Sequence, residues 1–236
     1  MKNLSWELIL IILISFPSLF LSIDPWNEYD IYILSVQWGS TMCLTQGQDC
    51  YEKMKKVPRH QMTIHGLWPS LSTGKNLDYC NPGADIPIED SGSENFENMK
   101  KYWPSLNKNP NEVFWEHEFN KHGYCYLKKY NYDGNKYEIY FKKVLDLFFN
   151  FKINNLMINI AGDADDGEYV LPDDFVDKMD AKFGQNTYSL RCTKNGGDYY
   201  LSEIRIKFDL NFQLTTKGKS QNSCPNGKPI HVIYVS

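Results

Sequence analysis

The sequence has no excess of positive charge. It contains 25 Lys and Arg against 29 Asp and Glu, which gives a formal net charge of -4 and an isoelectric point near 5.7. A domain that binds DNA stably usually carries a basic surface, so no DNA partner is expected. The same charge is compatible with an enzyme that binds a nucleic acid only during its reaction.

The sequence also lacks repeats, low-complexity stretches and linkers that would divide it. Its 16 Tyr, 13 Phe and 6 Trp argue against disorder. At the N-terminus, a short apolar run follows Lys2 and is interrupted by Pro17. We expect residues 1–22 to be a secretory signal peptide and residues 23–236 to form a single domain, with no membrane attachment after cleavage. An uncleaved membrane anchor is the alternative.

No Cys-x-x-Cys pair is present, which argues against a zinc ribbon and against a thioredoxin-like redox site. An even number of cysteines after a signal peptide instead predicts three disulfides, formed in the secretory pathway of an extracellular or vacuolar protein. Six cysteines allow 15 connectivities, and their spacing does not choose among them. The six are Cys43, Cys50, Cys80, Cys125, Cys192 and Cys224.

Strand patterns lie at both ends of the chain, and helical patterns lie between them. Alternating, β-branched and aromatic residues predict strands over residues 29–38, 187–193, 199–210 and 230–236, and a short strand that runs into a turn over residues 61–70. Helical spacing and end signals predict helices over residues 95–103, 111–123, 135–151 and 172–184. This order favours an α+β fold with several helices packed on a central, mainly antiparallel sheet.

The helix predicted over residues 111–123 contains FWEHEFNKHGYC, which starts at residue 114 and runs past the predicted helix end at Gly123. On an α-helix, His117, Glu118, Lys121 and His122 project to one side. A zinc-protease helix needs histidines at i and i+4, whereas here they are at i and i+5, and the lysine would oppose a bound cation. The motif therefore does not favour a metal.

The same four side chains suit a phosphate. Histidine titrates near neutral pH, so one can accept a proton while another donates one. Glu118 can orient or charge a neighbouring histidine, and Lys121 can stabilise negative charge on phosphoryl oxygens. A solvated helix face with Glu–Lys pairs fits the composition equally well.

A second segment, TIHGLWPS at residues 63–70, supplies another proton-transfer group. We expect a short strand that gives way to a turn at Gly66 and Pro69. His65 would then lie at the end of the strand beside Trp68, whose ring can stack on a base. Gly66 permits close backbone approach. By itself, a histidine in such a turn is more often structural.

Together, IHGLWPS and FWEHEFNKHGYC closely resemble the two active-site segments of the ribonuclease T2 family. The similarity extends to VQW at residues 36–38, KYWPSL at residues 101–106 and LSEIRIKFD at residues 201–209, and it is greatest to the plant branch of self-incompatibility and related extracellular ribonucleases. The resemblance implies an α+β fold and endonucleolytic cleavage of single-stranded RNA with low base specificity. It also implies a 2′,3′-cyclic phosphate intermediate and no metal or other cofactor. RNA would be the substrate, and we expect a monomer.

The resemblance implies a role for each polar residue of the two segments. His122 would accept the proton of the 2′-hydroxyl as general base, and His65 would protonate the leaving 5′-oxygen as general acid. His117 would hold the phosphate, while Glu118 and Lys121 would stabilise the pentacovalent transition state. Substrate contacts would come from Trp68, Gln37, Ser105, Leu106 and Phe114.

The resemblance also implies a disulfide pattern, because the matching cysteines of the family pair as Cys43–Cys50, Cys80–Cys125 and Cys192–Cys224. Three positions depart from the family pattern without removing a proposed catalytic group. Tyr124 replaces the usual Thr, Phe119 replaces a Trp or Tyr, and Lys207 stands where many plant members carry another cysteine.

Two other classes of function are open from the sequence. A secreted zinc hydrolase would use His117 and Glu118, and a non-catalytic binding protein would share the scaffold. His60, His231 and the acidic run at residues 162–168, which faintly resembles a calcium loop, are interpreted as structural or solvated. Self-incompatibility ribonucleases tend to be basic and glycosylated. This acidic chain has its one Asn-x-Ser/Thr sequon, at Asn3, inside the expected signal peptide, which favours RNA turnover, phosphate scavenging or defence over a role in the pistil.

Overall fold

The computed structural model describes residues 29–58, 60–80, 93–129, 136–161 and 167–234. The predicted signal peptide and most of the acidic run at residues 162–168 lie outside these ranges. In the described part of the chain, no helix has the length and apolar character that crossing a membrane requires.

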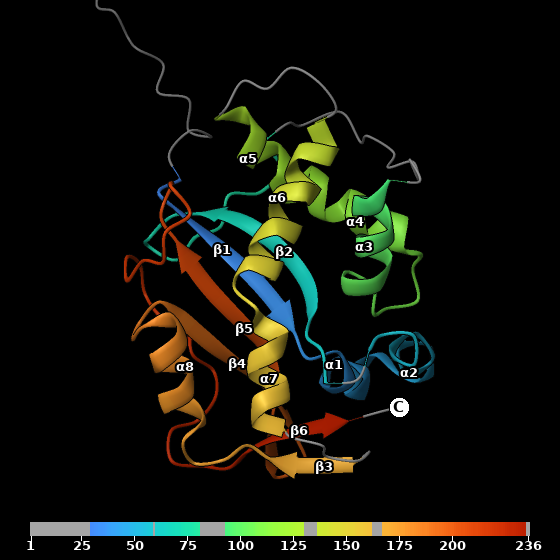
Figure 1. The fold of residues 1–236 in the computed structure, drawn as a ribbon, viewed down its shortest axis with the longest axis vertical. Coiled ribbons are helices and arrows are strands. Elements are labelled where there is room, and N and C mark those ends of the chain that lie inside the picture. The colour runs from blue at the N-terminus through green and yellow to red at the C-terminus, as the bar shows by residue number, and fades with distance from the viewer. Residues whose placement is uncertain (1–28, 59, 81–92, 130–135, 162–166, 235–236) are drawn as a thin grey trace, which may run out of the picture.

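A six-stranded sheet forms the centre of the fold (Figure 1). Its strands are β1 (Ile31–Gln37), β2 (Thr63–Ser70), β3 (Gly167–Val170), β4 (Tyr188–Asn195), β5 (Asp198–Phe208) and β6 (Ile230–Tyr234). The order is β2-β1-β5-β6-β3, with β4 paired to β5. Only the β5–β6 pair of these strands is parallel, which confirms the predicted α+β class with a mainly antiparallel sheet.

Helices pack against the sheet and around its edges (Figure 1). The predicted helices are present as α3 (Glu94–Tyr102), α4 (Asn111–Glu118), α6 (Lys136–Asn150) and α8 (Phe175–Phe183). Local sequence patterns do not predict α1 (Gly39–Gln46), α2 (Gln48–Met54), α7 (Ile153–Ala161) or β3. The helices α1 and α2 are short and meet at Gly47, which has a φ of 79°, so they carry little periodic signal.

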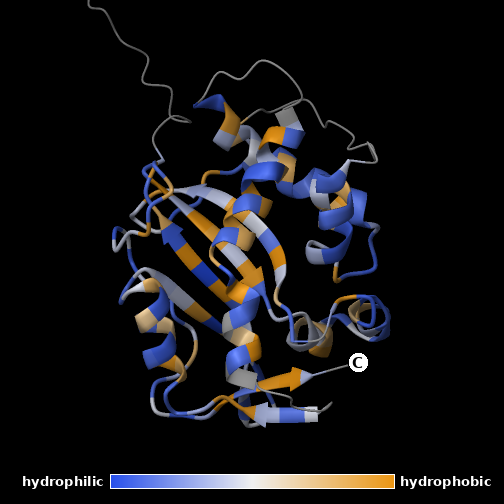
Figure 2. Ribbon diagram, in the orientation of Figure 1, coloured by the Kyte–Doolittle hydropathy of each residue, from blue (hydrophilic) through white to orange (hydrophobic). Residues whose placement is uncertain are grey.

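The two faces of the sheet carry different side chains. Ile204, Ile206 and Phe208 point into the main core, which α6 helps to enclose. The residues that alternate with them are Glu203, Arg205 and Lys207, and hydrophobic and hydrophilic residues alternate along β5 in Figure 2. The polar side chains of β5 therefore share the opposite face, which is also largely buried because Glu203 is 7% and Lys207 3% exposed.

Lys207, one of the three departures from the pattern of the resembled family, bonds to the segment that follows β5. Its ammonium donates a hydrogen bond to the carbonyl oxygen of Gly218 at 2.8 Å. The main chain adds a second link, because Thr215 N donates to Lys207 O at 3.1 Å. The segment after β5 is thus held to the strand by non-covalent bonds at the position where the resemblance implied that a cysteine could stand.

The three disulfides are Cys43–Cys50, Cys80–Cys125 and Cys192–Cys224, which confirms the pattern implied by the family resemblance. The first joins α1 to α2, and the third joins β4 to the segment before β6. The second joins the segment after β2 to α5 (Tyr124–Lys128).

Two predicted element ends are wrong. The strand β2 does not give way to a turn at Gly66 but continues to Ser70. It can include Pro69 because it is an edge strand that pairs only with β1, so the missing N–H need not cost a ladder hydrogen bond.

The helix starting at α4 does not end at Gly123 either. It passes into the π-helix η2 (Phe119–Gly123) and then into α5. Gly123 has an ordinary helical φ of -62°. A Cβ at this position would lie 2.5 Å from Cδ2 of Phe119, so the glycine accommodates aromatic packing and does not terminate the helix.

Candidate active site

His65 is the extra residue of a β-bulge. In the β1–β2 pairing, Ile64 lies opposite Val36 and Gly66 lies opposite Ser35, so His65 has no counterpart on β1. A bulge bends the strand and changes the direction of a side chain. His65 is thus near the start of β2, not at its end as predicted, and the irregular register turns its imidazole toward the polar face of the sheet.

His122 reaches the site from η2, where one π-turn adds a residue to the helical repeat. The α-helical spacing used to place the four polar side chains therefore does not hold at this position. His122 is buried, with 2% of its surface exposed, whereas His117 in the preceding α-helical turn is exposed. His117 nevertheless stays close enough for its charge to contribute to lowering the pKa of His122.

Trp68 lies between the two proton-transfer candidates. Its ring is 5.0 Å from the ring of His65 and 5.5 Å from that of His122, measured between centroids. The guanidinium of Arg205 lies 4.9 Å from the Trp68 ring centroid, and the indole Nε1 donates a hydrogen bond to Oε2 of Glu118 at 3.1 Å. Trp68 is itself only 5% exposed, so it holds the surrounding groups in place.

Glu118 is a buried carboxyl group, with 2% of the residue exposed. Its Oε1 lies 3.8 Å from Nε2 of His65. Burial raises the pKa of Glu118, and the nearby charge of His65 and the hydrogen bond from Trp68 only partly offset this rise. Gly66 allows the carboxylate to approach so closely, because a Cβ at residue 66 would overlap Oε2 of Glu118. The close approach expected at this glycine is confirmed.

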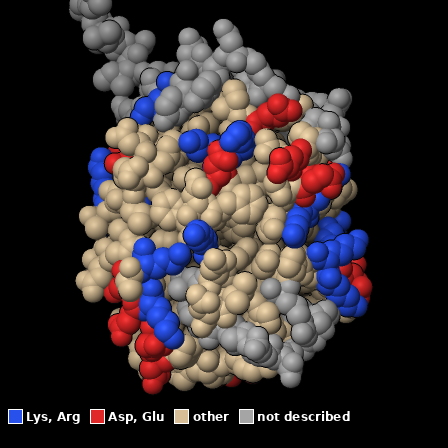
Figure 3. Space-filling view, in the orientation of Figure 1, with Lys and Arg blue, Asp and Glu red and all other residues tan. Residues whose placement is uncertain are grey.

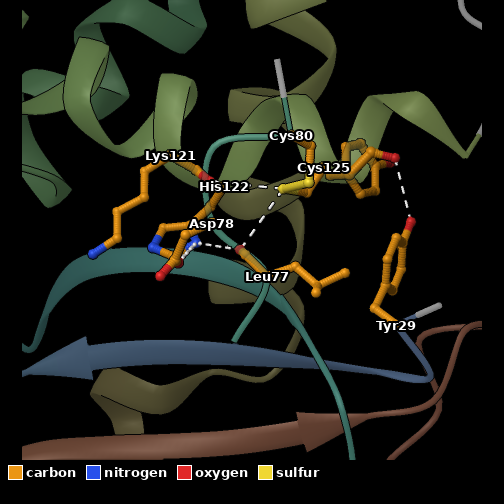
Figure 4. The surroundings of a disulfide bond; sticks show 8 residues. Tyr29, Leu77, Asp78, Cys80, Lys121, His122 and Cys125 are labelled. Carbon is orange, nitrogen blue, oxygen red and sulfur yellow. Dashed lines mark hydrogen bonds and ion pairs between the residues drawn. A yellow bond between two sulfur atoms is a disulfide. The ribbon is translucent and has the colours of Figure 1, made fainter. Parts of the chain in front are cut away.

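The environment of His122 keeps its imidazole neutral. Burial, followed by the charge of Lys121, lowers the pKa of His122 to about 3. Its Nδ1 faces the carbonyl oxygen of Leu77 and a carboxylate oxygen of Asp78, both at 3.4 Å (Figure 4). A carbonyl only accepts, so Nδ1 carries the proton and Nε2 has a free lone pair. The Cys80–Cys125 disulfide lies beside this contact (Figure 4).

The environment of His65 favours its charged form. Its Nδ1 donates to Oε1 of Glu203 at 2.7 Å. Burial lowers the pKa of His65, but the hydrogen bond to Glu203 and the charges of Glu118 and Glu203 outweigh that effect and raise the pKa above its ordinary value of 6.5. The two histidines therefore have pKa values shifted in opposite directions, as a paired acid and base require.

Comparison with known proteins gives the family of this arrangement. The family model described as "Ribonuclease T2 family" matches residues 29–224. The chain belongs to the ribonuclease T2 family. Ribonuclease 1 of Arabidopsis thaliana is 37% identical over 129 residues, which cover 53% of this chain and 55% of that protein. Ribonuclease S-7 of Nicotiana alata is 29% identical over 220 residues, covering 90% and 89% of the two chains.

A solved structure of trichomaglin, described as a novel S-like ribonuclease, is 28% identical and superposes with a TM-score of 0.66. The match covers 89% of this chain and all (100%) of that chain. These relatives confirm the predicted resemblance to the plant branch. The chain is therefore a T2-type endoribonuclease, and RNA is the class of substrate that this family membership indicates.

The remaining predicted catalytic residues of this T2 domain lie beside the two histidines. Lys121 is partly exposed, and its side chain extends to the same side as the ring of His122 (Figure 4). The charges of His117 and Lys121 lower the pKa of both Glu118 and His122, although burial is the largest influence on each. Both side chains are thus within electrostatic reach of Glu118 and His122.

The predicted substrate-binding residues are more dispersed. The ring of Phe114 lies 6.0 Å from that of His65 and is partly exposed, so it borders the catalytic groups. Gln37, Ser105 and Leu106 are buried, with 4%, 0% and 6% of their surfaces exposed. Leu106 packs with Met54 in a separate hydrophobic cluster. A base pocket formed by these residues stays a prediction.

Several residues that support the site are not among those predicted from the sequence. Glu203 and Arg205 were quoted only as part of a family-like segment, and Trp103 was not assigned a role. Trp103 Nε1 donates to the main-chain oxygen of His65 at 2.9 Å, which anchors the bulge. The alternation of charged residues with isoleucines along LSEIRIKFD was the available signal, since charges in a buried strand need partners.

A separate group of metal-ligand types occurs among the described residues. Glu168, Asp198 and His231 lie near one another where β3, β5 and β6 meet. In this group Nδ1 of His231 lies 2.6 Å from Oε1 of Glu168, the distance of an ion pair. None of the predicted catalytic residues belongs to this group.

Proposed function

We propose that this chain cleaves single-stranded RNA, with low base specificity, by metal-independent transphosphorylation. Nε2 of His122 takes the proton of the 2′-hydroxyl, and the 2′-oxygen attacks phosphorus. The bond from phosphorus to the 5′-oxygen breaks, and Nε2 of His65 protonates that oxygen. The products are a 2′,3′-cyclic phosphate and a free 5′-hydroxyl, and the proton balance leaves His122 charged and His65 neutral.

The observation that carries this proposal is the pair of opposed histidine environments on either side of Trp68. The surroundings of His122 favour its neutral form with Nε2 unprotonated, and those of His65 favour its protonated form. Lys121 and the exposed His117 supply positive charge for the phosphate, and the buried Glu118 lies 3.8 Å from Nε2 of His65, where charge develops during transfer. Figure 3 shows charges of both signs scattered over its face of the molecule, without a continuous basic surface, which suits transient binding of RNA.

The direct test is the product formed at early times. Cleavage of a dinucleotide should release a 2′,3′-cyclic phosphate, detected by mass spectrometry, and a substrate with a 2′-O-methyl group at the cleavage site should not be cleaved. EDTA should leave the rate unchanged. A linear phosphate formed without a cyclic precursor, or a rate abolished by EDTA, would overturn the mechanism in favour of the metal-dependent alternative.

The shifted pKa values predict the pH dependence of the reaction. The base must be unprotonated, so activity should fall only as the pH drops toward the pKa of His122, about 3. The acid must be protonated, so activity should fall as the pH rises through the pKa of His65, which lies above 6.5. We therefore expect kcat/KM to be highest at mildly acidic pH in a profile measured from about pH 3 to about pH 9. An acid limb at or above pH 6.5 would contradict the assignment.

For location and biological role, we propose a secreted, monomeric enzyme of RNA turnover, phosphate scavenging or defence. The predicted signal peptide and the three disulfides support passage through an oxidising compartment. The net charge of -4 and the lack of a sequon after Asn3 favour this role over self-incompatibility, which stays the alternative because the chain aligns with Ribonuclease S-7 over most of its length. Expression confined to the pistil, and not found in leaf or root, would favour the alternative.

A further inference from the structure

We propose that Glu203 is a positioning residue for the reaction, which orients the imidazole of His65 and holds the proton that His65 delivers. The proposal rests on the role of His65 as general acid in the proposed function. It adds a carboxylate, on the central strand β5, that belongs to neither of the two active-site segments.

The first argument is the geometry of the contact. Oε1 of Glu203 accepts a hydrogen bond from Nδ1 of His65 at 2.7 Å. A carboxylate accepts only, so this bond fixes the proton on Nδ1 and leaves Nε2 as the atom that can carry a transferable proton. Nε2 is also the atom that faces Oε1 of Glu118, at 3.8 Å. Glu203 thus selects which nitrogen of His65 does the chemistry.

The second argument is that Glu203 is itself rigidly held. It is 7% exposed, and Ser35 donates its hydroxyl to the same Oε1. The other oxygen, Oε2, accepts from Nε of Arg205 at 2.6 Å. Both carboxylate oxygens therefore have partners, and β1 and β5 supply them from paired positions, since Ser35 lies opposite Arg205 in the sheet.

The third argument is that Arg205 is placed to limit the effect of Glu203. Its guanidinium packs on Trp68, and one nitrogen donates to Oε1 of Gln221 at 3.2 Å. This cation keeps Glu203 ionised, because the pKa of Glu203, raised by burial, is brought down to about 2 by His65 and Arg205. It also opposes the positive charge on His65. Glu203 and Arg205 thus act on the proton of His65 in opposite directions.

Charges also reach this region from elements other than β5. Glu118 of α4 favours the protonated form of His65. Three further basic side chains lie nearby, which are Lys121 and His122 of η2 and His117 of α4. The charge of His65 also contributes to lowering the pKa of His122. If Glu203 were lost, Glu118 would be the remaining carboxylate that raises the pKa of His65.

The experiment compares the pH profiles of kcat/KM for two variants. In Glu203→Gln the amide oxygen can still accept from Nδ1, but the charge is gone, so the basic limb should move to lower pH by about one unit or more. In Arg205→Gln the opposing cation is gone, so the basic limb should move to higher pH. Glu203→Asp should restore part of the wild-type profile, and Glu97→Gln, at an exposed Glu–Lys pair, is the control.

The readout separates positioning from support of the fold. A residue that only stabilised the sheet would lower activity equally at all pH values and would not give shifts of opposite sign in the two variants. A titration of the His65 ring by NMR in the intact chain reports the same pKa change even if a variant is too unstable for kinetics. Wild-type limbs in both variants, or equal losses at every pH, would overturn the proposal.

The same assay includes His65→Gln, so that the two proposals can fail separately. Full activity of His65→Gln would overturn the proposed function itself. If His65→Gln is inactive while Glu203→Gln retains the wild-type profile, the general acid stands and the role of Glu203 falls.

Discussion

Replacing His122 with Gln is expected to reduce kcat/KM for RNA cleavage by about 10² to 10⁴-fold, because the base that accepts the 2′-hydroxyl proton is lost. His65→Gln should cause a loss of the same order, because the leaving oxygen then departs without a proton. Gln is chosen because it preserves polarity in a site where His122 is 2% exposed. The rates of both variants on a dinucleotide, with melting temperatures as a check on folding, provide the measurement.

His231→Gln is the matched control for both variants. His231 is also partly buried and also contacts a carboxylate, Glu168, but it lies outside the catalytic cluster. It should keep the wild-type rate. The double variant of His65 and His122 should lose little more than either single variant, because residues that act as a unit give non-additive losses. A folded His122→Gln protein with unchanged kcat/KM would show that the base is elsewhere.

Gly66→Ala should cause a large loss of activity without removing any catalytic group. A Cβ at residue 66 would overlap Oε2 of Glu118 and lie 2.8 Å from Nε1 of Trp68. The Trp68–Glu118 hydrogen bond must then break, and the indole ring of Trp68, which contacts both histidines, must move. Because a displacement of about 1 Å in a catalytic group can cost about 10²-fold, we expect a fall of this order in kcat, measured with saturating RNA.

Gly197→Ala is the control for this substitution. Gly197 has nothing within 4 Å of the added Cβ and does not require a positive φ, so the same chemical change should leave kcat unaltered. A Gly66→Ala variant that is folded and as active as the wild type would show that the close contact of Glu118 with β2 is not needed for the reaction.

Much of the fold could be predicted from local patterns. The strands β1, β4, β5 and β6 and the helices α3, α6 and α8 follow from alternation, helical spacing and end signals. The helices α1 and α2 were missed because the Cys43–Cys50 disulfide and a turn at Gly47 hold short segments that have little periodicity. The ends of β2 and of the helix through Gly123 were predicted wrongly, because edge position and aromatic packing permit what local propensity disfavours.

The chemical types at the site were readable from two short segments. The spacing of His117, Glu118, Lys121 and His122 disfavoured a metal, and the resemblance of this segment and of the segment around His65 to a known family then indicated phosphate chemistry. Their side-chain directions were not readable in the same way. A β-bulge aims His65 and a π-turn aims His122, and each is a one-residue irregularity that periodic patterns average away.

Residue identity therefore indicated the family, the ribonuclease activity that goes with it and the cysteine partners implied by that family. Packing decided the directions in which the pKa values of the two histidines shift, because a pKa depends on burial and on charges brought from distant parts of the chain. Glu203 is 138 residues from His65 in sequence, yet it accepts the hydrogen bond that orients the His65 ring. No local pattern encodes that pairing, because it exists only where the register of β1, β2 and β5 brings the two side chains to one face of the sheet.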